Sequence, residues 1–458
     1  MTHPGTAPTP PRTGLHGRIH AIRRELAVPL YRNTYALMLN TAVNSAFGLL
    51  YWVVAARTYP EAEVGRGNAL TSLMLLVSVL TQLNFSQALI RFLPRSGTAS
   101  ARLILVSYAV SSGLGILGAG GVAVYCHLFR DPGDPLHMSL PFGLWFVASV
   151  VIWSLFNLQD AALTGLRESL WIPLENGIYG IVKLVLLVVV AQTAVSDGVF
   201  TSWTLPVIAL IVPVTLLLFR RLLPRHVAAT RADQEPVSRR TLARYMAGDY
   251  AGQVFNQMSS TFLPVLIVGL MGPEEGAYFL PAQTVFTAIN LLTMGITSSL
   301  IAEAARDPAH GHRYARAVLR RIALTVLPAS VVIALVAPWL LQLYGTQYRE
   351  NATFLLQLLM ISVFPRVVVS LYMTMARLEN RTAPLAWIQL VQSVLLIAGV
   401  AVLHGPLGLN SVGWVTLVVE IVLALAVGPV VLRWLRGHRT GHVPAAATTG
   451  GEGRPGLR

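Results

Sequence analysis

The chain has 458 residues, of which 54% are hydrophobic and only 12% are charged, and its formal net charge is +14. An ordinary soluble domain carries roughly 25% charged residues, so this composition excludes a soluble enzyme with a single anchor. The single cysteine, Cys126, excludes an intramolecular disulfide framework and a multi-cysteine metal site.

Apolar segments of about 20 residues, the length that crosses the hydrocarbon core of a bilayer, recur along the whole chain. We expect the first of them to be retained, because its apolar run is too long for a cleavable signal peptide. The sequence predicts twelve spans, at 33–55, 67–93, 102–126, 140–164, 171–193, 201–219, 247–271, 277–302, 322–344, 352–376, 383–404 and 411–432. The predicted fold class is therefore an all-α polytopic membrane protein.

The first span carries a stripe of polar side chains that has a counterpart in the seventh span. The stripe consists of Asn33, Asn40 and Asn44, and its counterpart, 216 residues later at each position, of Asp249, Asn256 and Ser260. Offsets of 7 and 11 residues return to within about 20° of the starting direction, so each stripe lies on one face of its helix. Polar groups are costly in hydrocarbon, so both faces should meet protein or water.

Spans two and eight also carry polar stripes, so the internal repeat extends to the second span of each half. These residues are Thr71, Ser78 and Gln82 in span two and Gln283, Asn290 and Thr297 in span eight. At a register of 211 residues, Gly65 also aligns with Gly276. We interpret the four stripes as the lining of a central cavity between two parallel six-helix lobes, suited to a substrate rich in hydroxyl groups. Hydrogen bonding that merely holds helices together is the alternative.

The longest connection is basic, contains Pro224 and Pro236, and separates six spans from six. We expect five segments: a cytoplasmic N-terminal tail (1–32), an N-terminal lobe (33–220), a basic linker (221–246), a C-terminal lobe (247–434) and a disordered tail (435–458).

The basic residues are distributed very unevenly between alternate connections. Of the 34 basic residues, 28 lie in the termini and in one set of loops, whereas the opposite loops hold only Arg57, Arg66, Arg130 and Arg349. The positive-inside rule therefore predicts a multi-pass membrane protein with both termini in the cytoplasm. We expect the arginines at the span ends to contact lipid headgroups and find no folded basic surface for nucleic acid.

Charges at membrane depth mark further candidate residues. Arg366 lies near the middle of span ten, where its side chain could receive a phosphate or diphosphate or form a structural ion pair. Arg91, at the end of span two, is either an interfacial residue or a guard at the cytoplasmic mouth. Asp249 is the candidate for binding a coupling cation, with an ion pair to an arginine as the alternative. Four further residues could line the cavity or form structural pairs: Asp160, Glu175, Lys183 and Glu420.

No motif of a hydrolase, nucleotide-binding protein or metal enzyme is present, so we expect no catalytic or metal residue and no cofactor, apart from a possible coupling Na⁺ or H⁺. Glu61 and Glu63 could mark a membrane glycosyltransferase that uses a lipid-phosphate donor. The repeat copy Pro273-Glu274-Glu275-Gly276 instead favours a duplicated turn with acids at a helix start.

The stretch from Asn33 to Arg95, with NSAFGLLYWVVAARTYPEAEVGRGNALTS and SQALIRFLPR, resembles polysaccharide flippases of the multidrug/oligosaccharidyl-lipid/polysaccharide superfamily. The resemblance implies alternating access between two lobes and a cavity lined by spans one, two, seven and eight. It also implies transfer of a polyprenyl-diphosphate-linked oligosaccharide to the outer leaflet of a bacterial plasma membrane. Its partners would be that lipid-linked substrate, membrane lipids and other polysaccharide-assembly proteins. A cation-coupled multidrug exporter of the same fold, and less strongly a glycosyltransferase or polymerase, remain alternatives.

Overall fold

The computed structural model describes residues 29–193, 197–231, 238–304, 311–378 and 382–435. Within these ranges the chain forms helices and no strands, which confirms the predicted all-α fold class. Among the described residues, eleven helices are long and apolar enough to cross a membrane. Each of the twelve predicted spans overlaps a long helix, and the seventh lies in the helix Arg239–Met271, whose described part includes the apolar stretch Ser260–Met271.

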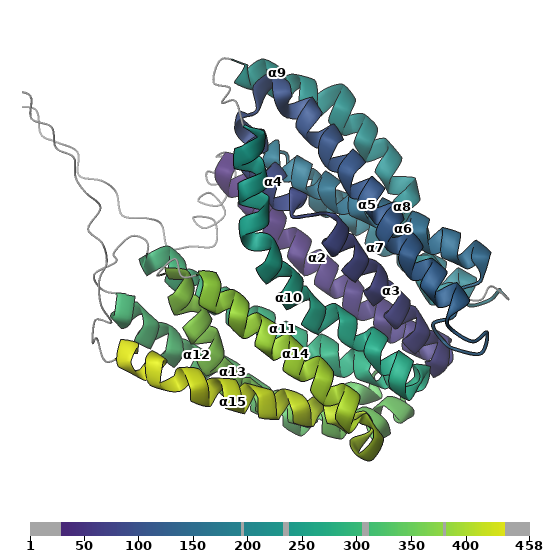
Figure 1. Ribbon diagram of the computed structural model, residues 1–458, viewed down its shortest axis with the longest axis vertical. Coiled ribbons are helices and arrows are strands. Elements are labelled where there is room, and N and C mark those ends of the chain that lie inside the picture. Colours follow the sequence, from purple (N-terminus) through teal and green to yellow (C-terminus); the bar gives the residue numbers. More distant parts are fainter. Residues whose placement is uncertain (1–28, 194–196, 232–237, 305–310, 379–381, 436–458) are drawn as a thin grey trace, which may run out of the picture.

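The first half of the chain forms the N-terminal bundle (Figure 1). Its long helices are α2 (Pro29–Thr58), α3 (Glu61–Thr81), α5 (Ser100–Leu128), α6 (Leu140–Gly165), α7 (Trp171–Val190) and α8 (Gly198–Leu217). Its short helices are α4 (Phe85–Phe92), the 3₁₀ turns η1 (Leu93–Arg95) and η2 (Gly97–Ala99), the π-helix η3 (Leu218–Leu222) and α9 (Leu223–Thr230).

The second half forms the C-terminal bundle. Its helices are α10 (Arg239–Met271), α11 (Pro273–Ala304), α12 (Gly311–Gln342), α13 (Thr346–Leu378), α14 (Thr382–Leu407) and α15 (Asn410–Leu435). Helix α10 contacts α3 of the first bundle as well as α14 of the second. The division of the chain at 221–246 therefore remains a prediction, because α10 belongs by contact to both halves.

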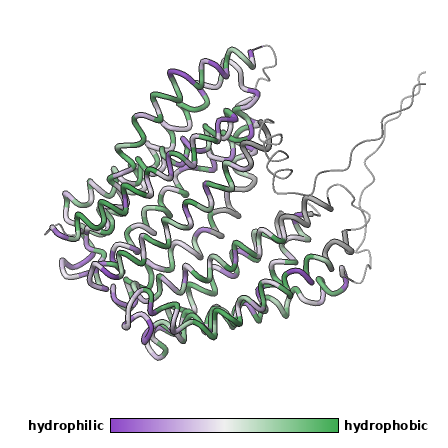
Figure 2. Tube along the Cα trace, turned by 180° about the vertical axis from the view of Figure 1, so that it is seen from behind, coloured by the Kyte–Doolittle hydropathy of each residue, from purple (hydrophilic) through white to green (hydrophobic). Residues whose placement is uncertain are grey.

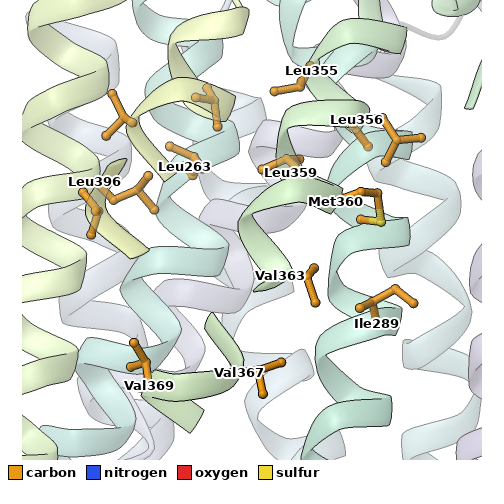
Figure 3. Packing of buried hydrophobic residues seen from close by; sticks show 14 of the residues in the cluster. Leu263, Ile289, Leu355, Leu356, Leu359, Met360, Val363, Val367, Val369 and Leu396 are labelled. Carbon is orange, nitrogen blue, oxygen red and sulfur yellow. The ribbon is translucent and has the colours of Figure 1, made fainter. Parts of the chain in front are cut away.

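Each bundle is organised around one buried helix. In the C-terminal bundle that helix is α13, whose Leu355, Leu359 and Val363 are buried against neighbouring helices, including α10 through Leu263 (Figure 3). In the N-terminal bundle the buried helix is α3, whose buried residues include several small ones beside larger aliphatic side chains: Gly65, Gly67, Ala69, Ser72 and Ser78. Small side chains let membrane helices approach closely, which explains how a helix of modest hydropathy occupies the centre.

The two bundles touch at one end and diverge toward the end at which α2 begins and α15 ends (Figures 1 and 2). At the touching end, Gly65 of α3 lies so close to α11 that an added Cβ would stand 1.7 Å from the carbonyl oxygen of Pro273. Arg57 of α2 donates to the carbonyls of Gln342 and Leu343 at the end of α12, at 2.7 and 2.9 Å. If the termini are cytoplasmic, as predicted, this arrangement is open toward the cytoplasm.

Candidate functional site

The second predicted span is broken, and the break creates a polar site in the N-terminal bundle. Helix α3 ends at Thr81 and α4 starts at Phe85, and between them Leu83 and Asn84 both adopt positive φ angles, of 47° and 65°. Such backbone is costly for residues other than glycine and is least costly for asparagine among them. The apolar pattern of 67–93 predicted one continuous helix, so the break is a correction to the sequence analysis.

A pocket of about 390 Å³ lies beside this break. Its walls come from α2, α3, α4, α6, α7 and α10. Five carboxamide side chains line it: Asn40, Gln82, Asn84, Gln87 and Asn157. The other polar side chains in its wall are Ser86, Asp160, Thr164 and Tyr250. We call this space the polar pocket.

Several polar atoms in the wall of the polar pocket have no hydrogen-bond partner among the described residues. They are the Nε2 of Gln82, both side-chain polar atoms of Asn84 and the Oδ1 of Asp160. The remaining atoms are held: Gln82 Oε1 accepts from Ser86 Oγ at 3.0 Å, and Asp160 Oδ2 accepts from Asn176 Nδ2 at 3.2 Å. Because Gln82 and Asn84 are also buried, their unpaired groups are costly unless a ligand satisfies them.

A second acid lies close to the polar pocket. Glu175 of α7 is 3% exposed, and neither of its carboxylate oxygens has a partner among the described residues. Asn176, the residue directly after Glu175, donates to Asp160 in the hydrogen bond just described. The sequence analysis left both acids open as cavity or structural residues, and the structure places Asp160 in the pocket wall.

Lys183 occupies a separate aromatic cage, two turns further along α7. Its Nζ lies 3.9, 4.8 and 5.1 Å from the ring centroids of Trp203, Tyr179 and Tyr51. Cation–π attraction to these three rings takes the place of a carboxylate partner for Lys183 here. The hydroxyl of Tyr51 donates to the carbonyl of Val199 at 2.7 Å, which fixes one wall of the cage.

The stripe residues of the first two spans separate in the structure. Asn44 is exposed and donates to Asn40 at 3.3 Å, while Asn40 lines the polar pocket. In α3, Thr71 and Ser78 are buried inside the bundle, where Ser78 donates to the carbonyl of Val150 in α6 at 3.3 Å. Of that stripe, Gln82 alone reaches the polar pocket. The side chains of Asn33, Asp249 and Asn256 lie outside the described residues.

The stripe residues of α10 and α11 bond to backbone carbonyls. Gln283 donates to the carbonyl of the exposed Ser260 at 2.6 Å and so ties α11 to α10. Asn290 and Thr297 donate to carbonyls within their own helix, at 2.9 and 3.1 Å. In this conformation these three side chains make bonds within and between helices, and their contact with a substrate remains a prediction.

The two arginines singled out in the sequence both have partners. Arg366 of α13 forms an ion pair with Glu420 of α15, whose Oε1 also accepts from Gln392 at 2.7 Å. Arg91 is exposed, and its guanidinium carbon lies 4.5 Å from the ring centroid of Tyr245 in α10. The structural ion pair, one of the two readings open for Arg366, is therefore observed, and a role toward a substrate remains a prediction for both residues.

The acids in the first outer turn lie at a helix start, as the sequence favoured. Glu61 and Glu63 occupy the first turn of α3, and Glu274 and Glu275 occupy the first turn of α11. Glu63 Oε1 accepts from the backbone N–H of Gly198 at 3.2 Å, at the start of α8. This bond gives Glu63 a structural role at the start of α8.

The site contains residues that the sequence analysis did not select. Asn84, Gln87, Asn157, Thr164 and Tyr250 line the polar pocket although they belong to no repeated stripe. Tyr250 donates to the carbonyl of Leu80 at 2.6 Å, next to the helix break. A signal was available for one of them, because Asn157 precedes Asp160 by three residues and thus shares its helix face.

No family model matches the chain, and no curated protein matches its sequence. Its fold, however, is found among solved transporters. An inward-facing multidrug-resistance MATE transporter of the MOP superfamily is similar with a TM-score of 0.64 at 16% identity, covering 87% of this chain and 98% of that one. An outward-facing structure of such a transporter gives 0.59 at 16% identity, covering 89% and 96%.

A third similar structure is a MOP-superfamily transporter from Pyrococcus furiosus, described as having a binding pocket of reversed polarity. Its TM-score is 0.58 at 15% identity, and the alignment covers 89% of this chain and 95% of that one. All three alignments extend over nearly the full length of both chains. The chain therefore has the fold of the MATE transporters of the MOP superfamily.

Proposed function

We propose that the protein is a membrane transporter that moves a polyprenyl-diphosphate-linked oligosaccharide to the outer leaflet by alternating access. The observation that carries the proposal is the chemistry of the polar pocket, which is dominated by carboxamides. Carboxamide groups both donate and accept hydrogen bonds, as the hydroxyl groups of a sugar do. A sugar ring beside Gln82, Asn84 and Asp160 would satisfy unpaired donors and acceptors together.

The mixture of unpaired atoms distinguishes a sugar from a bare cation. A bound cation would satisfy the oxygens of Asn84 and Asp160 but would leave the N–H groups of Gln82 and Asn84 unpaired. In this mechanism the sugar lies in the polar pocket, the polyprenyl chain stays in the lipid, and rocking of the bundles exposes the sugar on the other side. No covalent step is required.

A cation-coupled exporter of small drugs is the second candidate, and one observation favours it. Asp160 and Glu175 are acids inside the N-terminal bundle with unpaired oxygens. Acids held in that way can bind and release a proton or a cation as the bundles move. The first candidate requires the carboxamides for transport, whereas the second requires the acids.

The test is transport of a labelled polyprenyl-diphosphate-linked sugar in vesicles that contain the purified protein. In the Asn84→Gly variant the backbone keeps its favoured left-handed conformation while the carboxamide is lost. We expect the transport rate to fall roughly tenfold, which corresponds to the loss of one or two hydrogen bonds. Asn351→Ala is the matched control, because this exposed carboxamide bonds only within its own helix, to Gln347.

The two candidates give opposite results in the same vesicles. If the labelled lipid stays in its original leaflet while a fluorescent lipophilic cation is exported, and Asp160→Asn stops that export, the protein is a cation-coupled exporter. If Asn84→Gly transports the labelled lipid as fast as Asn351→Ala, the polar pocket does not hold the sugar.

A further inference from the structure

A second pocket, of about 750 Å³, lies at the end of the N-terminal bundle where α9 packs. Three separate parts of the chain supply its arginines. Arg95 comes from the α4–α5 connection, Arg167 from the loop between α6 and α7, and Arg225 from α9. Glu168 is the one acid in its wall, so the formal charge of the wall has an excess of two positive charges. We call this space the basic pocket.

Arg167 occupies a position at which arginine is unfavourable. Its φ angle is 63°, and it ends α6 in a Schellman arrangement, with Arg167 N donating to Thr164 O at 3.0 Å and Glu168 N to Leu163 O at 2.9 Å. Glycine is the usual residue at this position, because a side chain there costs free energy. Strained residues of this kind concentrate at binding sites, so the guanidinium at this position calls for a functional reason.

The element that carries Arg225 is also irregular. Helix α8 passes through the π-helix η3 before continuing as α9, whose second residue is Pro224. An extra residue in a helical turn rotates everything beyond it by about 100°, so η3 determines which face of α9 meets the pocket. His226 Nε2 contacts the carbonyl of the buried Leu93 at 3.1 Å and holds α9 against η1.

The position of the basic pocket along the membrane helices identifies the kind of ligand. The apolar part of α6 ends at Gly165 and that of α7 begins at Trp171. A bilayer that covers these apolar segments would place Arg167 at the boundary between hydrocarbon and water. Leu166 and Leu222 in the same wall are buried and apolar. A ligand with a negative head and an apolar continuation fits both parts of the wall.

We propose that the basic pocket binds the phosphate of an anionic lipid headgroup at the membrane surface. Arginine recognises phosphate oxygens through paired N–H groups, and converging arginines between membrane helices are suited to lipid headgroups. The site is separate from the polar pocket and does not depend on what the protein transports.

The experiment measures lipid bound to the intact purified protein by native mass spectrometry. Three probes are added in turn: phosphatidylglycerol, a polyprenyl diphosphate and soluble inorganic diphosphate. The variants are Arg167→Gly and Arg225→Gln, and the matched control is Arg102→Gln, an exposed arginine in the first turn of α5 that does not line the pocket. Thermal unfolding of each variant is measured in parallel.

We expect each pocket variant to reduce the apparent affinity for the lipid about tenfold, whereas the control retains it. Arg167→Gly should unfold at the same or a higher temperature than the parent, because glycine relieves the left-handed strain. A loss of lipid together with unchanged or raised stability cannot come from misfolding.

The probes identify the source of the phosphate. Arginine-dependent retention of phosphatidylglycerol identifies a membrane phospholipid, and retention of polyprenyl diphosphate alone identifies the carrier lipid; both outcomes support a lipid phosphate site. Binding of inorganic diphosphate without either lipid, or equal lipid retention by the pocket variants and the control, would overturn the proposal.

Discussion

Arg366 and Glu420 form an ion pair inside the C-terminal bundle, and the two side chains differ in how deeply they are buried. The side chain of Glu420 is 1% exposed, whereas that of Arg366 is 26% exposed and lies near Phe286, with the guanidinium carbon 5.5 Å from the ring centroid. Removing the arginine would leave a carboxylate buried without its partner. Breaking a buried ion pair on one side costs about 3–5 kcal/mol, whereas replacing both charges is often neutral.

We therefore expect Arg366→Ala to lower the free energy of unfolding by about 3–5 kcal/mol. The double variant Arg366→Met/Glu420→Gln should recover most of that loss, because the new amide is neutral and can still accept from Gln392. Unfolding in detergent by heat or denaturant provides the measurement. If Arg366→Ala unfolds no more easily than the parent, the ion pair is not structural.

The transport rate of the double variant tests the sequence-based role of Arg366. A purely structural pair predicts that the double variant transports nearly normally. A residue that also receives the diphosphate predicts that folding recovers while transport does not.

At the scale of helices, the contact of α3 with α11 decides how closely the two bundles approach. An added Cβ at Gly65 would meet the Pro273 carbonyl oxygen at 1.7 Å, and ordinary contact begins only at 3.4 Å. Gly276, the repeat counterpart of Gly65, lies on the other side of the same contact. The 211-residue offset of the internal repeat therefore pairs Gly65 with Gly276, and these two residues also lie next to each other in the structure. The repeat by itself did not predict this contact.

We expect Gly65→Ala to separate the bundles at this end without unfolding either of them, because the clash is with backbone of the other bundle. The separation is measured between two spin labels, one at Phe129→Cys just after α5 and one at Trp339→Cys in α12, in a Cys126→Ala background. Both labelled positions are exposed. The distance distribution should move to longer values. In Gly48→Ala, where a Cβ meets nothing within 4 Å, it should not change. Equal distributions in the two variants would contradict the proposed contact.

The orientation of the whole molecule is a prediction from its charge distribution. The loops on the side of the divergent end carry most of the arginines, as the positive-inside rule requires of a cytoplasmic side. We expect a membrane-impermeant thiol reagent to label an Asp131→Cys variant in intact cells. An Arg231→Cys variant should be labelled only after permeabilisation, and both positions are exposed. The reverse pattern would invert the assigned orientation.

The sequence by itself determined the membrane class, the all-α fold and the order of the spans. These features follow from the length and apolar character of continuous segments, which are local properties. It also placed the acids of the α2–α3 turn at a helix start, since Pro60 and the duplicated copy mark that turn.

Only the tertiary structure decided which polar side chains share a site. Helical periodicity gives the direction of a side chain from its own axis, but not which helix lies opposite. Thr71 and Ser78 therefore point into the N-terminal bundle, and Glu420, from a helix far along the chain, meets Arg366. The polar pocket exists because the second span breaks at Asn84, and tertiary packing overrides the apolar pattern at that point.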